Sequence, residues 1–238
     1  MKADKILIFI PGYNVEPTIG VVLKKLKQVN LKFDILYIDN NSSDKSLNIV
    51  KKNKLKNLKY IRNKKNIGYG GSHKKAFEYA FKNKYEYLIE YAGDYQYPHN
   101  KILELYKKAK ESDYAIVFGS RITDKKHYKE MPKWKVFGNK IFNIINNWTC
   151  NFNVSEIHTG FRIYNLNLIK DFNYENCHND YRWTMDSVIE VMKVHPKFGE
   201  ISIKAFYHKD AQAPNFKQLF KVMSYMLLRG LYYKIVKD

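Results

Sequence analysis

A carboxylate and an amide directly follow an apolar run near the middle of the chain. The run extends from Tyr87 to Tyr91, and Asp94, Gln96 and Pro98 come next. This order predicts a buried strand that ends in a tight turn. The oxygens of Asp94 and Gln96 could hold one hard cation together with the phosphates of a substrate. The alternative is that Asp94 only caps the helix that begins near Pro98.

Short apolar runs alternate with helical patterns in the first half of the chain. The runs predict strands at 5–10, 33–38, 58–61, 87–91 and 114–119. Strands and helices that alternate in this way predict an α/β fold, with a Rossmann-like, mostly parallel sheet and helices on both faces. The side chains that follow the strands should therefore gather at one edge of the sheet, where ligands bind.

Polar residues follow each of these strands. They are Pro11, Tyr13 and Asn14; Asp39; Arg62, Asn66 and Gly68; Asp94 and Gln96; and Gly119, Ser120 and Arg121. One crevice would then contain a carboxylate for a base or ribose, an oxygen site for a cation and arginines for a diphosphate.

The regular alternation ends after Arg121. A polar loop (123–133) is expected first, then helices at 134–148, 166–172 and 184–194, a strand at 200–205 and a closing helix from about Asn215. We expect one catalytic domain over residues 1–212, followed by a basic amphipathic helix over 213–238.

The composition limits the classes of partner. The 238 residues have a formal charge of +19, but only five of the 42 basic residues are arginine. This lysine excess is typical of a solvated surface, whereas nucleic-acid sites favour clustered arginine, so no nucleic-acid partner is expected. The two cysteines demand no disulfide and fit a reducing cytosol. No signal peptide and no apolar run long enough to cross a bilayer is evident, so we expect a cytoplasmic location.

Two common nucleotide motifs are missing. No Gly-x-Gly-x-x-Gly follows the first strand, and no Gly-Lys-Ser/Thr loop occurs in the chain. These absences argue against a dinucleotide oxidoreductase and a P-loop NTPase.

Six short motifs, in order, resemble those of family 2 glycosyltransferases of the GT-A fold. They are Pro11-Gly12-Tyr13-Asn14, the segment 39–44, the segment 66–70, Gly93-Asp94-Tyr95-Gln96-Tyr97-Pro98, Gly119-Ser120-Arg121 and the segment 158–162. Within that family the chain looks most like the branch of dolichyl-phosphate mannosyltransferases and polyprenyl-phosphate hexosyltransferases. The resemblance extends from Lys5 to about Tyr207.

The resemblance implies an inverting transferase that uses a nucleotide-diphospho-sugar and a divalent cation, Mg²⁺ or Mn²⁺. By position, Asp94 and Gln96 would hold the metal, which offsets charge on the leaving group. The donor would be bound by Pro11, Tyr13, Asn14, Asp39, Asn66, Gly68 and Arg121. Arg121 and Arg162 suit phosphate oxygens of the donor or acceptor, and the alternative for each is a structural ion pair.

The chain departs from the family at one carboxylate. The first aspartate of the usual Asp-x-Asp element is Ala92, which leaves Asp94 as the principal ligand. Metal affinity should then be lower or metal dependence looser.

The acceptor decides whether a general base is needed. A phosphate acceptor is already anionic, whereas a sugar hydroxyl needs a carboxylate to take its proton. Glu156 and Asp186 are the candidates for that base, although Asp186 would equally fit an ordinary exposed helix position. We assign His158 no catalytic role.

The closing helix allows two interpretations. Its apolar face includes Val222, Met226 and Leu227, with basic residues elsewhere. It either packs on the catalytic domain or rests peripherally on the cytosolic face of an anionic membrane, beside a lipid-phosphate acceptor.

The leading hypothesis is hexose transfer from a UDP- or GDP-sugar to a polyprenyl phosphate. The second is transfer to a saccharide hydroxyl in surface glycan biosynthesis. A basic nucleic-acid-binding module and a degenerate, non-catalytic nucleotide-sugar binder are the remaining alternatives, and turnover that disappears in Asp94→Ala would exclude the degenerate binder.

Overall fold

A seven-stranded sheet forms the centre of the protein in the order β3-β2-β1-β4-β6-β5-β7. The structure, a computed structural model, describes residues 3–124, 126, 131, 133–150, 154–210 and 216–237. The strands are β1 (Ile6–Gly12), β2 (Asp34–Asp39), β3 (Leu58–Arg62), β4 (Tyr87–Tyr91), β5 (Ile116–Ser120), β6 (Phe161–Asn165) and β7 (Phe198–Ser202). Only β6 runs antiparallel to its neighbours, β4 and β5, so the predicted, mostly parallel sheet is confirmed.

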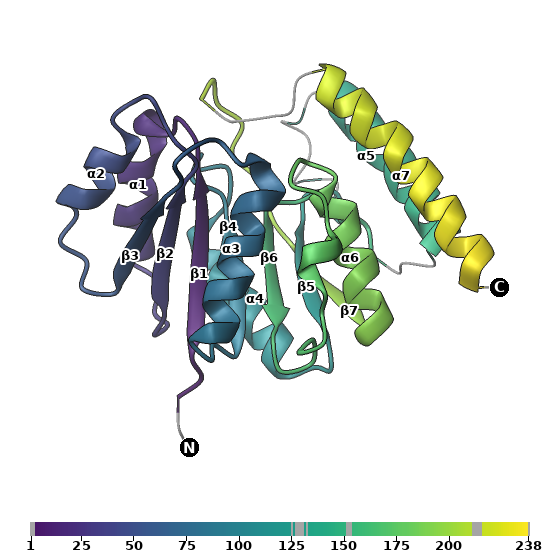
Figure 1. The fold of residues 1–238 in the computed structure, drawn as a ribbon, viewed down its shortest axis with the longest axis horizontal. Helices are drawn as coiled ribbons and strands as arrows, with labels where there is room; N and C mark the ends of the chain where they lie inside the picture. Colours follow the sequence, from purple (N-terminus) through teal and green to yellow (C-terminus); the bar gives the residue numbers. More distant parts are fainter. Residues whose placement is uncertain are drawn as a thin grey trace.

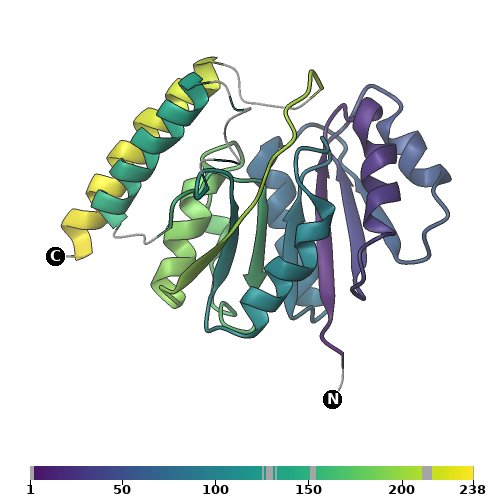
Figure 2. The ribbon, with the colours of Figure 1, turned by 180° about the vertical axis from the view of Figure 1, so that it is seen from behind.

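Helices cover both faces of this sheet (Figures 1 and 2). The bounds are α1 (Glu16–Leu26), α2 (Ser46–Lys52), α3 (Gly68–Lys82), α4 (Ile102–Lys110), α5 (Lys133–Cys150), α6 (Trp183–Val194) and α7 (Phe216–Lys237), with 3₁₀ turns η1 (His99–Lys101) and η2 (Tyr174–Asn176). One core cluster joins the sheet to α3 and α6 through Phe77, Trp183 and Val188. The other joins it to α1, α2 and α4 through Ile19, Val50 and Leu105. Both faces of the sheet are therefore covered by apolar side chains, which explains the nearly continuous apolar runs of the parallel strands.

Two expectations for the second half of the chain are corrected, and one strand was missed. Residues 166–172 form successive turns instead of a helix, because Leu168 N donates to Asn165 O and Phe172 N to Ile169 O. Ile169 and Phe172 are buried at three-residue spacing, which a chain of turns satisfies as well as a helix does. The strand expected at 200–205 is β7 and lies earlier, because residues 198–202 pair with β5. The antiparallel strand β6 was not predicted.

The helices α5 and α7 lie side by side, away from the sheet, in both views (Figures 1 and 2). They are the helices expected at 134–148 and from about Asn215, although Asn215 itself and the boundary at 212–213 lie outside the described residues. Most of the loop expected at 123–133 also lies outside them. No helix in the described ranges combines the length and the apolarity that a bilayer span requires.

Left-handed backbone conformations occur in three loops at the carboxyl edge of the sheet. Asn14 follows β1 with φ 52°, Asn41 follows β2 with φ 64°, and Tyr95 follows β4 with φ 58°. Asparagine tolerates this region, but an aromatic residue there is uncommon and is held by its surroundings. Tyr95 stacks on Phe206 with ring centroids 5.7 Å apart, and Phe206 N donates to Gln96 O at 2.8 Å. The chain after β7 thus fixes the turn that contains Asp94.

Candidate active site

A cavity of about 540 Å³ opens at the carboxyl edge of the sheet. Its floor is formed by the ends of β1 and β4, and its walls by the segment 158–162, the segment 180–184 and the two helices α5 and α7. Eight of the predicted site residues line it: Pro11, Tyr13, Asn66, Gly68, Asp94, Gln96, Arg121 and Arg162. Ala92, at the position of the missing carboxylate, lines it as well. Residues from distant parts of the chain therefore meet at the edge where ligands bind in α/β folds.

Asp94 and Gln96 form one polar unit on the cavity wall. The left-handed turn at Tyr95 brings Gln96 Nε2 to 2.8 Å from Asp94 Oδ2, and both side chains are largely buried. His208 Nε2 lies 2.8 Å from the carbonyl oxygen of Asp94 and holds the backbone of the turn. The carboxylate is thus held in place by its own turn.

The donor set of this unit fits a divalent cation that is bound mainly by a substrate. Mg²⁺ and Mn²⁺ are commonly held by one or two carboxylates with substrate phosphates and water. Asp94 supplies one carboxylate, and Ala92 supplies none. Within the described residues, no cluster of three or more histidine, cysteine or carboxylate side chains could hold a metal by itself. A cation here would depend on the diphosphate of a donor for most of its oxygens.

Arg121 and Glu156 form a buried ion pair beside the cavity. Arg121 donates to Glu156 through Nε at 2.9 Å, through Nη2 and through its backbone N–H at 2.8 Å. Burial alone would lower the pKa of Arg121. The charge of the Glu156 carboxylate and its hydrogen bonds with Arg121 act in the opposite direction, and the pKa of Arg121 is raised. Glu156 is fully buried and does not line the cavity. The arrangement places Glu156 behind Arg121, where it holds the guanidinium.

Arg162 occupies a second ion pair, directly under the cavity. Its Nε lies 3.0 Å from Glu90 Oε2, and both side chains are only 1% exposed. The other oxygen of Glu90 accepts from the Tyr69 hydroxyl and lies 3.0 Å from His73 Nε2. Burial alone would raise the pKa of Glu90, but the charges of Arg162 and His73 hold it at about 2. Arg162 is therefore positioned by a charged carboxylate, and it still lines the cavity.

His158 lies between the two arginines. Burial and the positive charges of Arg162 and Arg121 lower the pKa of His158 to about 3. Its Nε2 lies 3.3 Å from Asn146 Nδ2, and its carbonyl oxygen accepts from Arg121 at 3.1 Å. A neutral imidazole in this position adds no charge beside the two arginines.

The predicted nucleoside residues divide into two groups. Pro11, Tyr13, Asn66 and Gly68 line the cavity, and Asn66 Oδ1 accepts from Asn40 Nδ2 at 2.8 Å. Asp39 and Asn14 do not line it. Asn14 Oδ1 instead accepts from Ser43 N at 2.9 Å and ties the β1 and β2 loops together.

Asp39 is fully buried at the end of β2. Its Oδ2 lies 3.6 Å from Arg62 Nε and accepts from Ser42 N at 3.3 Å, whereas no described group hydrogen-bonds its Oδ1. A buried carboxylate oxygen that lacks a partner is costly, and a donor group on a nucleobase would satisfy it.

Gly68 and Gly70 allow the segment 178–180 to close over the start of α3. Gly68 has φ +82°, and a Cβ atom at Gly68 or Gly70 would lie 2.2 or 2.1 Å from the carbonyl oxygens of Asn179 or His178. This close approach brings Asp180 and Tyr181 to the cavity. The glycines in the segment 66–70 thus serve packing as well as ligand access.

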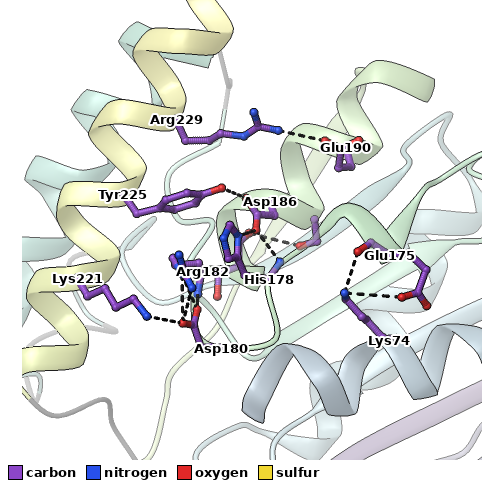
Figure 3. Close-up of polar contacts among 12 residues, drawn as sticks. Lys74, Glu175, His178, Asp180, Arg182, Asp186, Glu190, Lys221, Tyr225 and Arg229 are labelled. Carbon is purple, nitrogen blue, oxygen red and sulfur yellow. Dashed lines mark hydrogen bonds and ion pairs between the residues drawn. The ribbon is translucent and has the colours of Figure 1, made fainter. Parts of the chain in front are cut away.

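Asp186 lies on α6 (Figure 3) and does not line the cavity. Its Oδ2 accepts from the backbone N of His178 at 2.9 Å and lies 2.7 Å from His178 Nδ1, while the Tyr225 hydroxyl of α7 donates to Oδ1. It is buried, contrary to the expectation of an exposed helix residue. These contacts connect α6 to α7. The Asp186 carboxylate is therefore not available in the cavity as a general base.

Apolar side chains from α5, α7 and the residue Met131 before α5 also line the cavity. They are Met131, Phe142, Val222, Met223 and Met226, and Asn139 and Gln218 of the same helices line it beside them. Sequence reasoning noted the apolar face of the closing helix but not that it would form a wall of the site. Glu90 and His73 were also missed, although a carboxylate inside an apolar strand was visible in the sequence.

The comparisons with known proteins agree on one class. The sequence profile of glycosyl transferase family 2 matches residues 7–172. This match covers well over half of the chain, which therefore belongs to glycosyl transferase family 2. Its fold is the GT-A fold of this family.

Relatives of similar length share about a quarter of the sequence. An uncharacterised protein of Methanocaldococcus jannaschii is 27% identical over 94% of this chain and 93% of its own length. The UDP-N-acetylglucosamine–dolichyl-phosphate N-acetylglucosaminyltransferase of Methanococcus voltae is 25% identical over 95% of this chain and 96% of its own.

Solved structures share the fold. Mannosyl-3-phosphoglycerate synthase from Rubrobacter xylanophilus has a TM-score of 0.69 at 13% identity, covering 98% of this chain and 74% of the other. The mannosyltransferase PcManGT from Pyrobaculum calidifontis, solved with GDP-Man and Mn²⁺, has a TM-score of 0.60 at 12% identity, covering 99% and 74%.

Proposed function

We propose that this protein is an inverting hexosyltransferase that moves a sugar from a UDP- or GDP-linked donor to a polyprenyl phosphate. The observation that carries the proposal is the composition of the cavity. The cavity is lined by arginines and the Asp94–Gln96 unit together with apolar side chains of α5 and α7, and neither predicted base lines it. An acceptor with an anionic head and a hydrocarbon tail matches both kinds of lining.

The absence of a base favours a phosphate acceptor over a sugar hydroxyl. In the described part of the cavity the carboxylates are Asp94 and Asp180. Asp180 is held by Arg182 Nε at 2.9 Å and by Lys221 Nζ at 2.9 Å, and these contacts outweigh burial and lower its pKa. Such a carboxylate is a poor proton acceptor. A phosphate needs no deprotonation at neutral pH, so it can attack directly.

The transfer step needs few groups from the protein. An oxygen of the acceptor phosphate forms a bond to the anomeric carbon, and the bond from that carbon to the β-phosphate oxygen breaks. The nucleoside diphosphate leaves with the electron pair. Arg162, held by Glu90, and Arg121, held by Glu156, are rigid donors for these phosphate oxygens. Asp94 and Gln96 would hold a divalent cation, which neutralises charge on the leaving diphosphate.

We propose that the donor binds at the β1–β2 side of the cavity. Tyr13, Asn66 and Gly68 line that side, and Asp39 carries an unsatisfied oxygen beneath it. We propose that these residues bind the nucleoside. The relative from Methanococcus voltae is named as a UDP-N-acetylglucosamine–dolichyl-phosphate N-acetylglucosaminyltransferase. UDP-N-acetylglucosamine and dolichyl phosphate are therefore the first donor and acceptor to test.

A transfer assay with two acceptors tests the proposal. The protein is incubated with Mn²⁺, radiolabelled UDP-N-acetylglucosamine or GDP-mannose, and either a short polyprenyl phosphate or an oligosaccharide. We expect label in the organic extract and none on the oligosaccharide. Label on the oligosaccharide alone would overturn the phosphate acceptor. A thermal-shift series with UDP, GDP and CDP then identifies the base, because a ligand that binds the folded state raises the melting temperature.

A further inference from the structure

The helix α7 contacts the catalytic body through polar as well as apolar side chains, and it leaves further apolar side chains exposed. Lys221, Tyr225 and Arg229 follow one another at four-residue spacing and contact the acids of the catalytic body (Figure 3). Their partners are Asp180, Asp186 and Glu190. Val222 and Met226 also face the body, yet Phe220, Leu228 and Ile235 stay exposed. A helix on the surface of a soluble domain normally exposes polar side chains there.

The outward surface of α7 continues onto α5. Exposed apolar side chains on α7 include Phe220 (63%), Leu228 (66%) and Ile235 (74%), and those on α5 are Ile141, Ile144 (69%) and Trp148 (59%). Most of the large hydrophobic residues that are exposed in the described part of the chain lie on these two helices. We call this surface, formed by Ile144, Trp148, Phe220, Leu228 and Ile235, the outer face. A contiguous apolar surface of this kind marks an interaction site.

The charge of the two helices identifies what covers the outer face. Within their bounds, α5 and α7 contain eight lysines and arginines and no aspartate or glutamate. A second copy of the chain would bring an equally basic surface to the contact and be repelled. A bilayer with anionic headgroups supplies both an apolar layer and negative charge. At the edge of the face, Lys234 Nζ lies 4.1 Å from the ring centroid of Trp148, a pairing suited to the headgroup level.

We propose that the outer face of α5 and α7 docks the enzyme on an anionic membrane surface. This inference rests on the proposed function for its purpose, since a polyprenyl phosphate resides in the bilayer. The opposite sides of the same helices carry Phe142, Val222 and Met226, which line the cavity. Only one helix layer, about 10 Å thick, then separates the docked bilayer from the acceptor end of the cavity.

The polar contacts of α7 keep the outer face aimed at the membrane. If α7 rolled about its axis to bury Leu228 and Ile235, it would lose its bonds to Asp180, Asp186 and Glu190 and leave buried Asp186 without its Tyr225 donor. The loss of such bonds is costly. Asp180, Asp186 and Glu190 thus keep the outer face exposed in solution.

Vesicle co-sedimentation tests the docking without donor or acceptor. Vesicles of equal parts phosphatidylglycerol and phosphatidylcholine are compared with phosphatidylcholine alone, at low and high salt. We expect binding to the anionic vesicles that weakens at high salt. Leu228→Ser/Ile235→Ser should reduce it roughly tenfold or more, from the apolar area that no longer enters the bilayer. Val21→Ser on α1, an exposed apolar position away from these helices, is the matched control and should bind normally.

Three results would overturn the docking. They are no binding to either vesicle, equal binding by the double variant and the parent protein, or a concentration-dependent dimer that Leu228→Ser/Ile235→Ser dissociates. The positions are exposed, so circular dichroism and melting temperature should match the parent. Transfer to a detergent-dispersed acceptor separates the two proposals. Loss of vesicle binding with transfer retained supports the docking, and vesicle binding without any transfer contradicts only the proposed function.

Discussion

Glu90 and Arg162 face each other in register across β4 and β6, with Arg162 Nε 3.0 Å from Glu90 Oε2. Both are almost fully buried, and the pair lies directly beneath the cavity. A charged pair in a dry interior is rarely a net source of stability. The ion pair does fix the Arg162 guanidinium before a phosphate arrives, because the antiparallel strand β6 sets the position of Arg162.

Glu90→Gln should therefore damage both stability and transfer. The amide leaves Arg162 as an uncompensated buried charge, so we expect the free energy of unfolding to fall by about 3 to 5 kcal/mol. Transfer should fall as well, because the guanidinium is no longer held. Urea denaturation and initial rates measure the two effects. Glu78→Gln, an exposed position on α3, is the control and should change neither. A fully stable Glu90→Gln protein would contradict the role given to this pair.

Ala92→Asp should strengthen cation binding. Ala92 lines the cavity two residues before Asp94, so an aspartate there adds a second carboxylate near the Asp94–Gln96 unit. We expect a lower dissociation constant for Mn²⁺ in the presence of UDP or GDP, measured by calorimetry. Asp171→Asn, an exposed position, controls for general charge effects. Unchanged Mn²⁺ affinity in Ala92→Asp would mean that the cation binds elsewhere.

Asp94→Asn should remove most of the transfer activity. In the proposed role, the Asp94 carboxylate supplies the charge that would hold a cation on the leaving diphosphate, and loss of such electrostatic stabilisation costs roughly 10²–10³ in rate. Excess Mn²⁺ should not restore the rate. Circular dichroism checks that the turn at Tyr95 still forms. Near-normal turnover in this variant would show that Asp94 does not bear on the leaving group.

His158 should make the protein less stable in mild acid. Its pKa is about 3 in the folded protein, against an ordinary value near 6.5. The unfolded chain therefore binds a proton below about pH 6.5 that the folded protein refuses until about pH 3. Stability should fall across this window by up to ~1.4 kcal/mol per pH unit.

His158→Asn should flatten the decline between about pH 6.5 and 4.5, above the range where Glu90 begins to contribute. Glu90 acts lower, since its folded pKa of about 2 lies below its ordinary 4.5, and its stabilisation is lost between those values. Denaturant melts at several pH values measure both. An unchanged slope in His158→Asn would contradict a buried neutral imidazole.

Glu156→Gln should weaken binding of the nucleotide-sugar donor. It should not remove a general base, because Glu156 holds Arg121 and takes no proton from the acceptor in the proposed mechanism. Glu156 is fully buried and bound by Arg121 through several contacts, so its substitution releases the guanidinium. We expect a higher KM for the nucleotide-sugar. A plot of kcat against pH should keep the same acidic limb as in the parent protein. If that limb disappears while KM is unchanged, Glu156 acts as a base, and the acceptor is a hydroxyl.

The sequence alone determined the sheet and the edge at which the site forms. Strand and helix patterns depend on neighbours in the chain, so they predicted the parallel strands, and the residues after each strand followed from their position. Asp94, Gln96, Tyr13 and Arg121 could be placed at one edge for this reason. The spacing of Leu166, Ile169 and Phe172 could not separate a helix from successive turns, because both bury every third residue.

Only the tertiary structure decided which polar residues face the cavity and which hold other residues. Glu156, Asp186 and Glu90 are all acids in the sequence, but their partners Arg121, Tyr225 and Arg162 lie far away in the chain. Ion pairs of this kind depend on strand register and on helix packing, which no local pattern encodes. The same holds for α7, whose contacts with Asp180, Asp186 and Glu190 depend on acids that lie on α6 and the segment before it.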